Sequence, residues 1–221
     1  MITVLGAMLG HMGQPGGGVG YGYGCIHNMG FGGRRLPPYA VASLPQGQNP
    51  IKDFIPVARI TELLENPGGV LDYNGQRLSL PDIKLVYWAG GNPFHHHQDL
   101  NRLRRAWQRP DTVIVNEAVW TATARHADIV LPCTTMLERE DFGASNHDCF
   151  LSPMRRVREP LAQSRNDYLI FTELAKRLGV EQTFTEGRSE RQWIEHLYEV
   201  TRRNAAEKGD RKSTRLNSSH A

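Results

Sequence analysis

The sequence has 221 residues, with a hydrophobic content of 39%, a charged content of 22% and a formal net charge of +3, which is typical of a globular protein with a core of its own. No apolar run approaches the roughly 20 residues that a membrane helix needs. The three cysteines, Cys25, Cys133 and Cys149, are widely spaced and form no CxxC pair, which argues against a cysteine-based iron–sulfur or zinc site.

The first 55 residues are predicted to be mostly irregular. Residues 2–13 are apolar and fit a short helix, and they lack the basic start of an export signal. From Gln14 to about residue 50, glycine and proline are so dense that regular structure is excluded. A loop of this length is usually functional or packed on another part of a protein.

A helix and a hairpin come next. Residues 56–65 predict a helix whose start is marked by Pro56. Residues 70–80 have Asn74-Gly75 at their centre, and this dipeptide is typical of the tight turn of a β-hairpin.

From residue 83 onward, apolar strands and amphipathic helices alternate. The pattern predicts a β-α-β-α-β order followed by further helices. The expected strands are residues 83–89, 112–116 and 128–132, the helices between them 98–108 and 120–127, and the later helices 166–178 and 188–206. The predicted fold class is therefore α/β, with a parallel, Rossmann-like sheet covered on its faces, a Gly/Pro-rich irregular region before it and helices after it.

Polar residues and glycines gather where the first two strands end. Gly90-Gly91-Asn92-Pro93 follows the first strand, and Asn116-Glu117 ends the second. Ligands bind at the carboxyl ends of parallel strands, where glycine allows close approach, a helix start offers N–H groups to an anion and a carboxylate can accept from a ribose. These features favour half of a nucleotide site. The alternative is a structural turn, because GGNP is not GxGxxG.

Three further motifs have two interpretations each. His95-His96-His97 could bind a metal, but adjacent histidines point in different directions, which favours hydrogen-bonding roles. Residues 138–141 could be solvated surface charges, or Arg139 could hold a phosphate with its guanidinium fork. Asp167 could simply be a capping or first-turn acid. The glycines of 16–20 follow a helix rather than a strand, so they do not predict a phosphate loop.

The strand-end segments resemble the bis-molybdopterin guanine dinucleotide S/N-oxide reductases, the family of the dimethyl sulfoxide, trimethylamine N-oxide and biotin sulfoxide reductases. The most specific segments are residues 86–99 (VYWAGGNPFHHHQD) and 120–132 (WTATARHADIVLP), and the resemblance extends to Leu137-Glu138-Arg139 and to residues 8–18. It covers about residues 1–206.

The resemblance implies a molybdenum–bis(molybdopterin guanine dinucleotide) cofactor, an S-oxide or N-oxide substrate, and an electron donor that is a protein or reduced nicotinamide. Residues 1–82 would belong to a larger cofactor domain, and residues 83–206 would form the guanine-dinucleotide domain. The implied cofactor contacts are Asn92, His96, Asn116, Glu117, Arg139 and Asp167. Cys133 departs from the pattern, which commonly has alanine there, and the residue at Glu117 varies in the family.

Members of this family are several times longer than this chain. The resemblance therefore implies that the serine ligand of molybdenum and the C-terminal domain are missing, that the chain contains no catalytic residue, and that in isolation it is inactive. Two alternatives remain, a stand-alone nucleotide-binding module without redox chemistry and a structural domain without a ligand.

Residues 207–221 are predicted to be non-native. The run from Asp210 to His220 looks like the translation of a sequencing adapter, and it carries two Arg, one Lys and one Asp. It accounts for +2 of the formal charge of +3. The remaining chain is nearly neutral, which gives no argument for nucleic-acid binding.

Overall fold

A computed structural model describes residues 2–18, 41–143 and 151–207. These residues belong to two compact units, of which the larger comprises Leu44–Asp141 and Met154–Trp193 and the smaller comprises Met1–Ser43, Phe142–Pro153 and Ile194–Ala221. The predicted adapter-derived run from Asp210 to His220 lies outside the described residues.

The smaller unit contains one helix from the start of the chain and, from Ile194 onward, the last helix of the chain. Helix α1 (Ile2–Met8) is shorter than the predicted helix of residues 2–13, because Gly10 and Gly13 take φ angles of +70° and +80°, which a right-handed helix cannot contain. The predicted C-terminal helix is confirmed as α7 (Glu190–Glu207), and the strands β6 (Asp141–Gly143) and β7 (Ser152–Met154) pair in a two-stranded sheet.

The larger unit begins with the predicted helix and hairpin. A 3-10 turn, η1 (Val57–Arg59), leads into α2 (Ile60–Glu65), and β1 (Val70–Tyr73) pairs antiparallel with β2 (Gln76–Ser79). Asn74 and Gly75 connect the two strands with φ angles of 49° and 74°, so the predicted tight turn is confirmed. Leu71, Leu78 and Leu80 form a small core beneath the hairpin.

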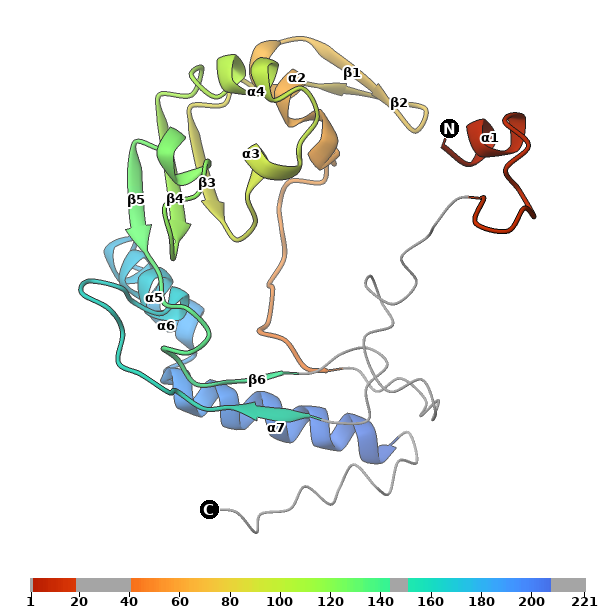
Figure 1. Ribbon diagram of the computed structural model, residues 1–221. Helices are drawn as coiled ribbons and strands as arrows, with labels where there is room; N and C mark the ends of the chain where they lie inside the picture. Colours follow the sequence, from red (N-terminus) through yellow and green to blue (C-terminus); the bar gives the residue numbers. More distant parts are fainter. Residues whose placement is uncertain (1, 19–40, 144–150, 208–221) are drawn as a thin grey trace. The chain divides into compact units, whose positions relative to one another are not determined.

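The three predicted parallel strands are present and adjacent. They are β3 (Leu85–Ala89), β4 (Thr112–Glu117) and β5 (Ile129–Pro132), in the order β3-β4-β5 with both pairings parallel. Figure 1 shows the three arrowheads at the same end of the sheet. The α/β class with a parallel sheet is confirmed.

One face of this sheet carries the main hydrophobic core. Its core residues come from α2, from the single turn α3 (Pro93–His96), from α4 (Leu100–Ala106) and from the middle of β4. Asp99 caps the start of helix α4, because its carboxylate accepts from the Arg102 backbone N–H at 3.1 Å. The buried cluster consists of Leu64, Phe94, Leu103, Ala106, Trp107, Val113 and Val115.

The other face of the sheet is less completely covered. Side chains alternate along a strand, so Tyr87, Ile114 and Leu131 lie on this second face. Helix α5 (Asp167–Arg177) packs here through a Tyr87–Phe171 ring contact of 5.6 Å. A hollow of about 790 Å³ remains among the three strands, α5 and residues 162–165.

Two details of the connections differ from the prediction. The expected helix of residues 120–127 is only a 3-10 turn, η2 (Ala124–His126), which ends at Ala127, where the backbone is extended. A short helix, α6 (Glu181–Thr185), is present between the two predicted C-terminal helices. Among the residues that the structure describes, no helix is long and apolar enough to cross a membrane.

Candidate functional site

The carboxyl ends of the three strands form one edge of the sheet. Ala89 pairs with Asn116, and Glu117 pairs with Pro132, so the last residues of neighbouring strands are level with one another. This edge, which we call the carboxyl edge, also receives the start of α5. Four chain segments therefore present their polar residues in the same place.

The turn after β3 requires its two glycines. Gly90 and Gly91 have φ angles of +82° and +77°, a region that residues with a Cβ rarely adopt. The helix that follows is a single turn. Its first N–H groups are used internally, because the N–H of Phe94 donates to the Thr123 hydroxyl at 3.4 Å and that of His95 donates to the Asn92 carbonyl at 2.9 Å. Two of the N–H groups that the sequence offered to an anion are therefore engaged within the protein.

Asn92 is held in place by a residue that sequence reasoning missed. Its side-chain oxygen accepts a hydrogen bond from the hydroxyl of Thr123, a fully buried residue in the connection between β4 and β5. The same hydroxyl accepts from the N–H of Phe94. Thr123 thus fixes the Asn92 amide relative to the backbone of α3. The amide nitrogen is left as the group that can donate hydrogen bonds to a ligand.

The three histidines have different environments. His95 and His96 are exposed, whereas His97 is half-buried and packs edge-on against Trp88 with ring centroids 6.3 Å apart. Burial, reinforced by the neighbouring His96, lowers the pKa of His97, so this ring is neutral at pH 7. Among the described residues no group of three or more His, Cys, Asp or Glu side chains could hold a metal ion.

Asn116 connects three elements of the larger unit. Its side-chain oxygen accepts from the Tyr87 hydroxyl at 2.8 Å, and its amide nitrogen donates to the Asp167 carboxylate at 2.9 Å. Asn116 itself is only 4% exposed. Two of the six predicted contacts, Asn116 and Asp167, are therefore in direct contact, and Tyr87 is a partner that an apolar strand pattern could not reveal.

Glu117 is oriented by its own neighbours. One carboxylate oxygen accepts from the Ala118 N–H and the other from the Thr121 hydroxyl, each at 3.0 Å. Each carboxylate oxygen can accept more than one hydrogen bond. The Glu117 side chain is therefore held at the carboxyl edge with acceptor capacity to spare.

Arg139 lies on the segment after β5. Its guanidinium donates to the Thr134 carbonyl at 3.1 Å and lies 3.6 Å from the Asp141 carboxylate. The residue before it, Glu138, is only 5% exposed and accepts from the Thr135 N–H at 3.0 Å. That backbone bond, together with Arg158 at 3.1 Å, lowers the pKa of Glu138. Glu138, which was predicted as part of a run of surface charges, is therefore buried and hydrogen-bonded to the backbone.

The pKa of the Cys133 thiol is influenced by several of these charges. Burial raises the pKa of its thiol to about 11, and the carboxylates of Asp167 and Glu117 add to that effect while Arg139 opposes it. An electrostatic effect of this kind requires proximity. The charges of Glu117, Arg139 and Asp167 therefore all influence this thiol, and Asn116 is hydrogen-bonded to Asp167. Asn92 and His96 lie at the end of the neighbouring strand, and no described hydrogen bond links them to this group.

Several buried polar side-chain atoms lack a protein partner. Trp88 Nε1, His97 Nε2, Trp107 Nε1 and Thr134 Oγ1 have no hydrogen-bond partner among the residues that the structure describes. Such atoms are costly to leave unpaired. The amide, carboxylate and guanidinium groups of the carboxyl edge form a separate donor and acceptor set, which suits a polar organic ligand such as a nucleotide.

Comparisons with known proteins agree about the kind of protein to which this chain is similar. The sequence model of the molybdopterin oxidoreductase family matches residues 1–177. The chain is 50% identical over 204 residues to the biotin sulfoxide reductase of Cereibacter sphaeroides. This match covers 91% of this chain and 27% of that protein. Among these relatives the chain spans about a quarter of their length.

Other relatives are N-oxide and S-oxide reductases. The trimethylamine-N-oxide reductase of Haemophilus influenzae is 46% identical, and the dimethyl sulfoxide/trimethylamine N-oxide reductase of Rhodobacter capsulatus is 44% identical; each match covers 90% of this chain and 25% of the relative. A solved structure, acetylene hydratase from Pelobacter acetylenicus, is similar over 47% of this chain and 14% of its own, with 26% identity and a TM-score of 0.43.

Proposed function

Because the chain belongs to the molybdopterin oxidoreductase family, we propose that its carboxyl edge binds the guanine dinucleotide portion of a molybdenum–bis(molybdopterin guanine dinucleotide) cofactor. We also propose that the whole protein reduces S-oxides or N-oxides and takes its electrons from a donor protein or reduced nicotinamide. The relatives that are 44–50% identical have names that support this class of substrate. The alternative, a nucleotide-binding module without redox chemistry, has no comparable support.

The observation that carries the proposal is the clustering at the carboxyl edge. Asn116 and Asp167 are hydrogen-bonded at 2.9 Å, and Glu117, Arg139 and Asp167 all act on the Cys133 thiol. These residues were selected as cofactor contacts from the sequence, where they are spread over about fifty positions. Their proximity at the carboxyl edge is what a binding site requires.

Each group has a chemical role that suits a guanine dinucleotide. The Arg139 guanidinium can donate two parallel hydrogen bonds to phosphate oxygens. The carboxylates of Glu117 and Asp167 can accept from ribose hydroxyls or from the N–H groups of the base. The amide nitrogen of Asn92 and the ring of exposed His96 can donate from the β3 side. In this family the cofactor supplies the oxygen-atom transfer, and these residues bind and orient it.

The domain assignment belongs to the same proposal. Residues 83–206 would form the guanine-dinucleotide domain with its Rossmann-like sheet, and residues 1–82 would be part of a larger cofactor domain. The parallel sheet with its polar carboxyl edge supports this assignment, because ligands of open α/β sheets bind at that edge. We expect the 221-residue chain in isolation to show no oxide reductase activity and to retain no molybdenum.

A chimera tests the proposal directly. The matching segment of the Cereibacter sphaeroides biotin sulfoxide reductase would be replaced by residues 1–206 of this chain, and molybdenum and guanine nucleotide per folded protein would be measured. Asn92→Ala, His96→Ala and Glu117→Ala should each lower cofactor content, because each leaves ligand groups unpaired at roughly 1–3 kcal/mol. Activity per bound molybdenum should stay near that of the unaltered chimera.

The matched control is Asn101→Ala, which changes an exposed asparagine on α4. It should alter neither cofactor content nor activity. A structural-turn role for Asn92 predicts a lower melting temperature with full cofactor content per folded molecule. Full cofactor occupancy in all three carboxyl-edge variants would overturn the proposal.

A further inference from the structure

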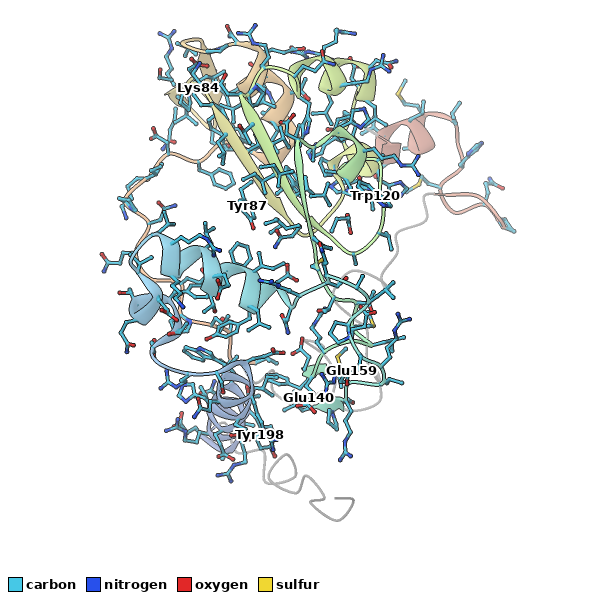
Figure 2. All side chains as sticks on the ribbon, turned by 90° about the vertical axis from the view of Figure 1, so that its left-hand side faces the viewer. Lys84, Tyr87, Trp120, Glu140, Glu159 and Tyr198 are labelled. Carbon is cyan, nitrogen blue, oxygen red and sulfur yellow. The ribbon has the colours of Figure 1, made fainter. Side chains whose placement is uncertain are left out.

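Three side chains form a continuous hydrogen-bonded chain across the larger unit. The Tyr87 hydroxyl from β3 donates to the Asn116 side-chain oxygen at 2.8 Å, and the Asn116 amide nitrogen from β4 donates to Asp167 Oδ1 at 2.9 Å. Figure 2 labels Tyr87, the first member of this chain, on β3. These three hydrogen-bonded side chains lie on the face of the sheet that α5 partly covers.

The direction of these bonds is dictated by chemistry. An ionised carboxylate accepts hydrogen bonds and donates none, so the amide nitrogen of Asn116 has to face Asp167. The amide oxygen then faces Tyr87, whose hydroxyl supplies the proton. Asn116 is 4% exposed, so a rotated amide would place its oxygen against the carboxylate in a buried environment, where an unmatched polar group is costly.

Tyr87 is built to hold its hydroxyl in this position. Its ring packs against Phe171 of α5 with centroids 5.6 Å apart, so the ring position is set by an apolar contact that does not involve the oxygen. Burial and the nearby Asp167 charge raise the pKa of the Tyr87 hydroxyl, although its bond to Asn116 works against them. Tyr87 therefore remains a neutral donor throughout the physiological range.

Asp167 keeps acceptor capacity for a ligand. Asn116 bonds to Oδ1, and no bond to Oδ2 is found among the described residues. Asp167 is also the first residue of α5, where the helix dipole favours a negative charge. Guanine carries two adjacent N–H donors, at N1 and on its 2-amino group, which match a carboxylate that is fixed in orientation.

We propose that Tyr87 is a positioning residue that sets base selectivity in the nucleotide site, because it fixes the Asn116 amide and thereby the Asp167 carboxylate. The inference rests on the proposed function and adds to it a residue that never touches the ligand. Tyr87 determines how well the site distinguishes guanine from a base that lacks the 2-amino group.

The experiment compares guanosine diphosphate with inosine diphosphate, which differs by that amino group. Both would be titrated calorimetrically into the cofactor-free form of the chimera described above and into its Tyr87→Phe variant, which removes the hydroxyl and keeps the ring contact. The unaltered chimera should bind the guanosine compound about tenfold more tightly, the value of one hydrogen bond to a charged group. In Tyr87→Phe the ratio should fall to about two- to threefold.

Matched variants keep the result interpretable. Tyr73→Phe in β1 is the control and should leave the ratio unchanged. Asn116→Ala interrupts the same chain at its middle and should lower the ratio as far as Tyr87→Phe does. The double variant should lower it no further, because both changes break one connection. Thermal unfolding of each variant identifies any that fails to fold.

The possible failures are distinguishable. Failure of the unaltered chimera to bind either nucleotide would overturn the proposed function and the inference with it. Equal weakening of both nucleotides in Tyr87→Phe, with the ratio intact, would assign Tyr87 a purely structural role and overturn the inference alone. The same conclusion would follow if Asp167→Asn removed the selectivity but Tyr87→Phe and Asn116→Ala both left it intact.

Discussion

The two faces of the β3–β5 sheet are packed very differently. The face covered by α4 is closed by apolar side chains, with Leu103 fully buried and Val113 only 2% exposed. The face covered by α5 leaves a hollow of about 790 Å³, and Leu174 of α5 is 38% exposed. The polar chain from Tyr87 to Asp167 lies on this second face. The first face holds the main hydrophobic core, and the second face holds the hollow and the hydrogen-bonded polar residues.

The largest effect on stability is expected for a substitution on the face that α4 covers. Leu103→Ala should lower the free energy of unfolding by about 2–5 kcal/mol, because it removes buried methyl groups and leaves a cavity in the main cluster. Urea denaturation of the folded chain measures this loss. A loss below about 1 kcal/mol would show that the first face is not closed as described.

The second effect concerns the thiol at the carboxyl edge. A pKa raised from 9.0 to about 11 leaves ~100-fold less thiolate at neutral pH. Iodoacetamide should therefore modify Cys133 ~100-fold more slowly in the folded chain than in the urea-unfolded chain. The measurement uses a variant in which Cys25 and Cys149 are serine. Equal rates in the two states would mean that the Cys133 thiol is not buried as described.

An intermediate effect is expected for Thr123, whose hydroxyl donates to the Asn92 side chain. Thr123→Val keeps the shape of a fully buried side chain but removes the hydroxyl that bonds to Asn92 and to the Phe94 N–H. The free energy of unfolding should fall by about 1–3 kcal/mol. Thr61→Val in α2 is the control, measured by the same urea titration. An unchanged midpoint for Thr123→Val would remove Thr123 from the account of Asn92.

The smallest effect is expected on the open face. Leu174→Ala should cost less than about 1 kcal/mol, because the side chain is 38% exposed and borders the hollow. The comparison with Leu103→Ala under identical conditions is the sharpest test of the difference between the faces. Equal losses for the two variants would show that α5 closes its face as completely as α4 does.

The sheet and its carboxyl edge were accessible from the sequence for a simple reason. Short apolar runs between turn signals predict buried parallel strands, and residues directly after them fall at one edge. Asn92, Asn116 and Glu117 were placed in this way. Arg139 and Asp167 follow loops whose course local patterns do not determine, so their assignment depended on the family resemblance.

What sequence reasoning missed are contacts between distant residues. Tyr87 lies within an apolar strand, and its bond to Asn116 joins positions 29 residues apart. Thr123 was assigned to a helix, but its segment forms only a 3-10 turn, and its hydroxyl bonds to Phe94 and Asn92, which are 29 and 31 positions away. The five-residue α6 has too few turns to show a periodic apolar pattern.

The bond between Asn116 and Asp167 also has a consequence for the order of folding. It joins residues that are 51 positions apart, whereas β3, β4 and β5 pair with strands close to them in sequence. Contacts between distant residues form late because the intervening loop has to close first. We expect the sheet to assemble before α5 docks, so a growing chain that ends before Asp167 would contain all three parallel strands but lack the carboxylate acceptor that Asn116 faces.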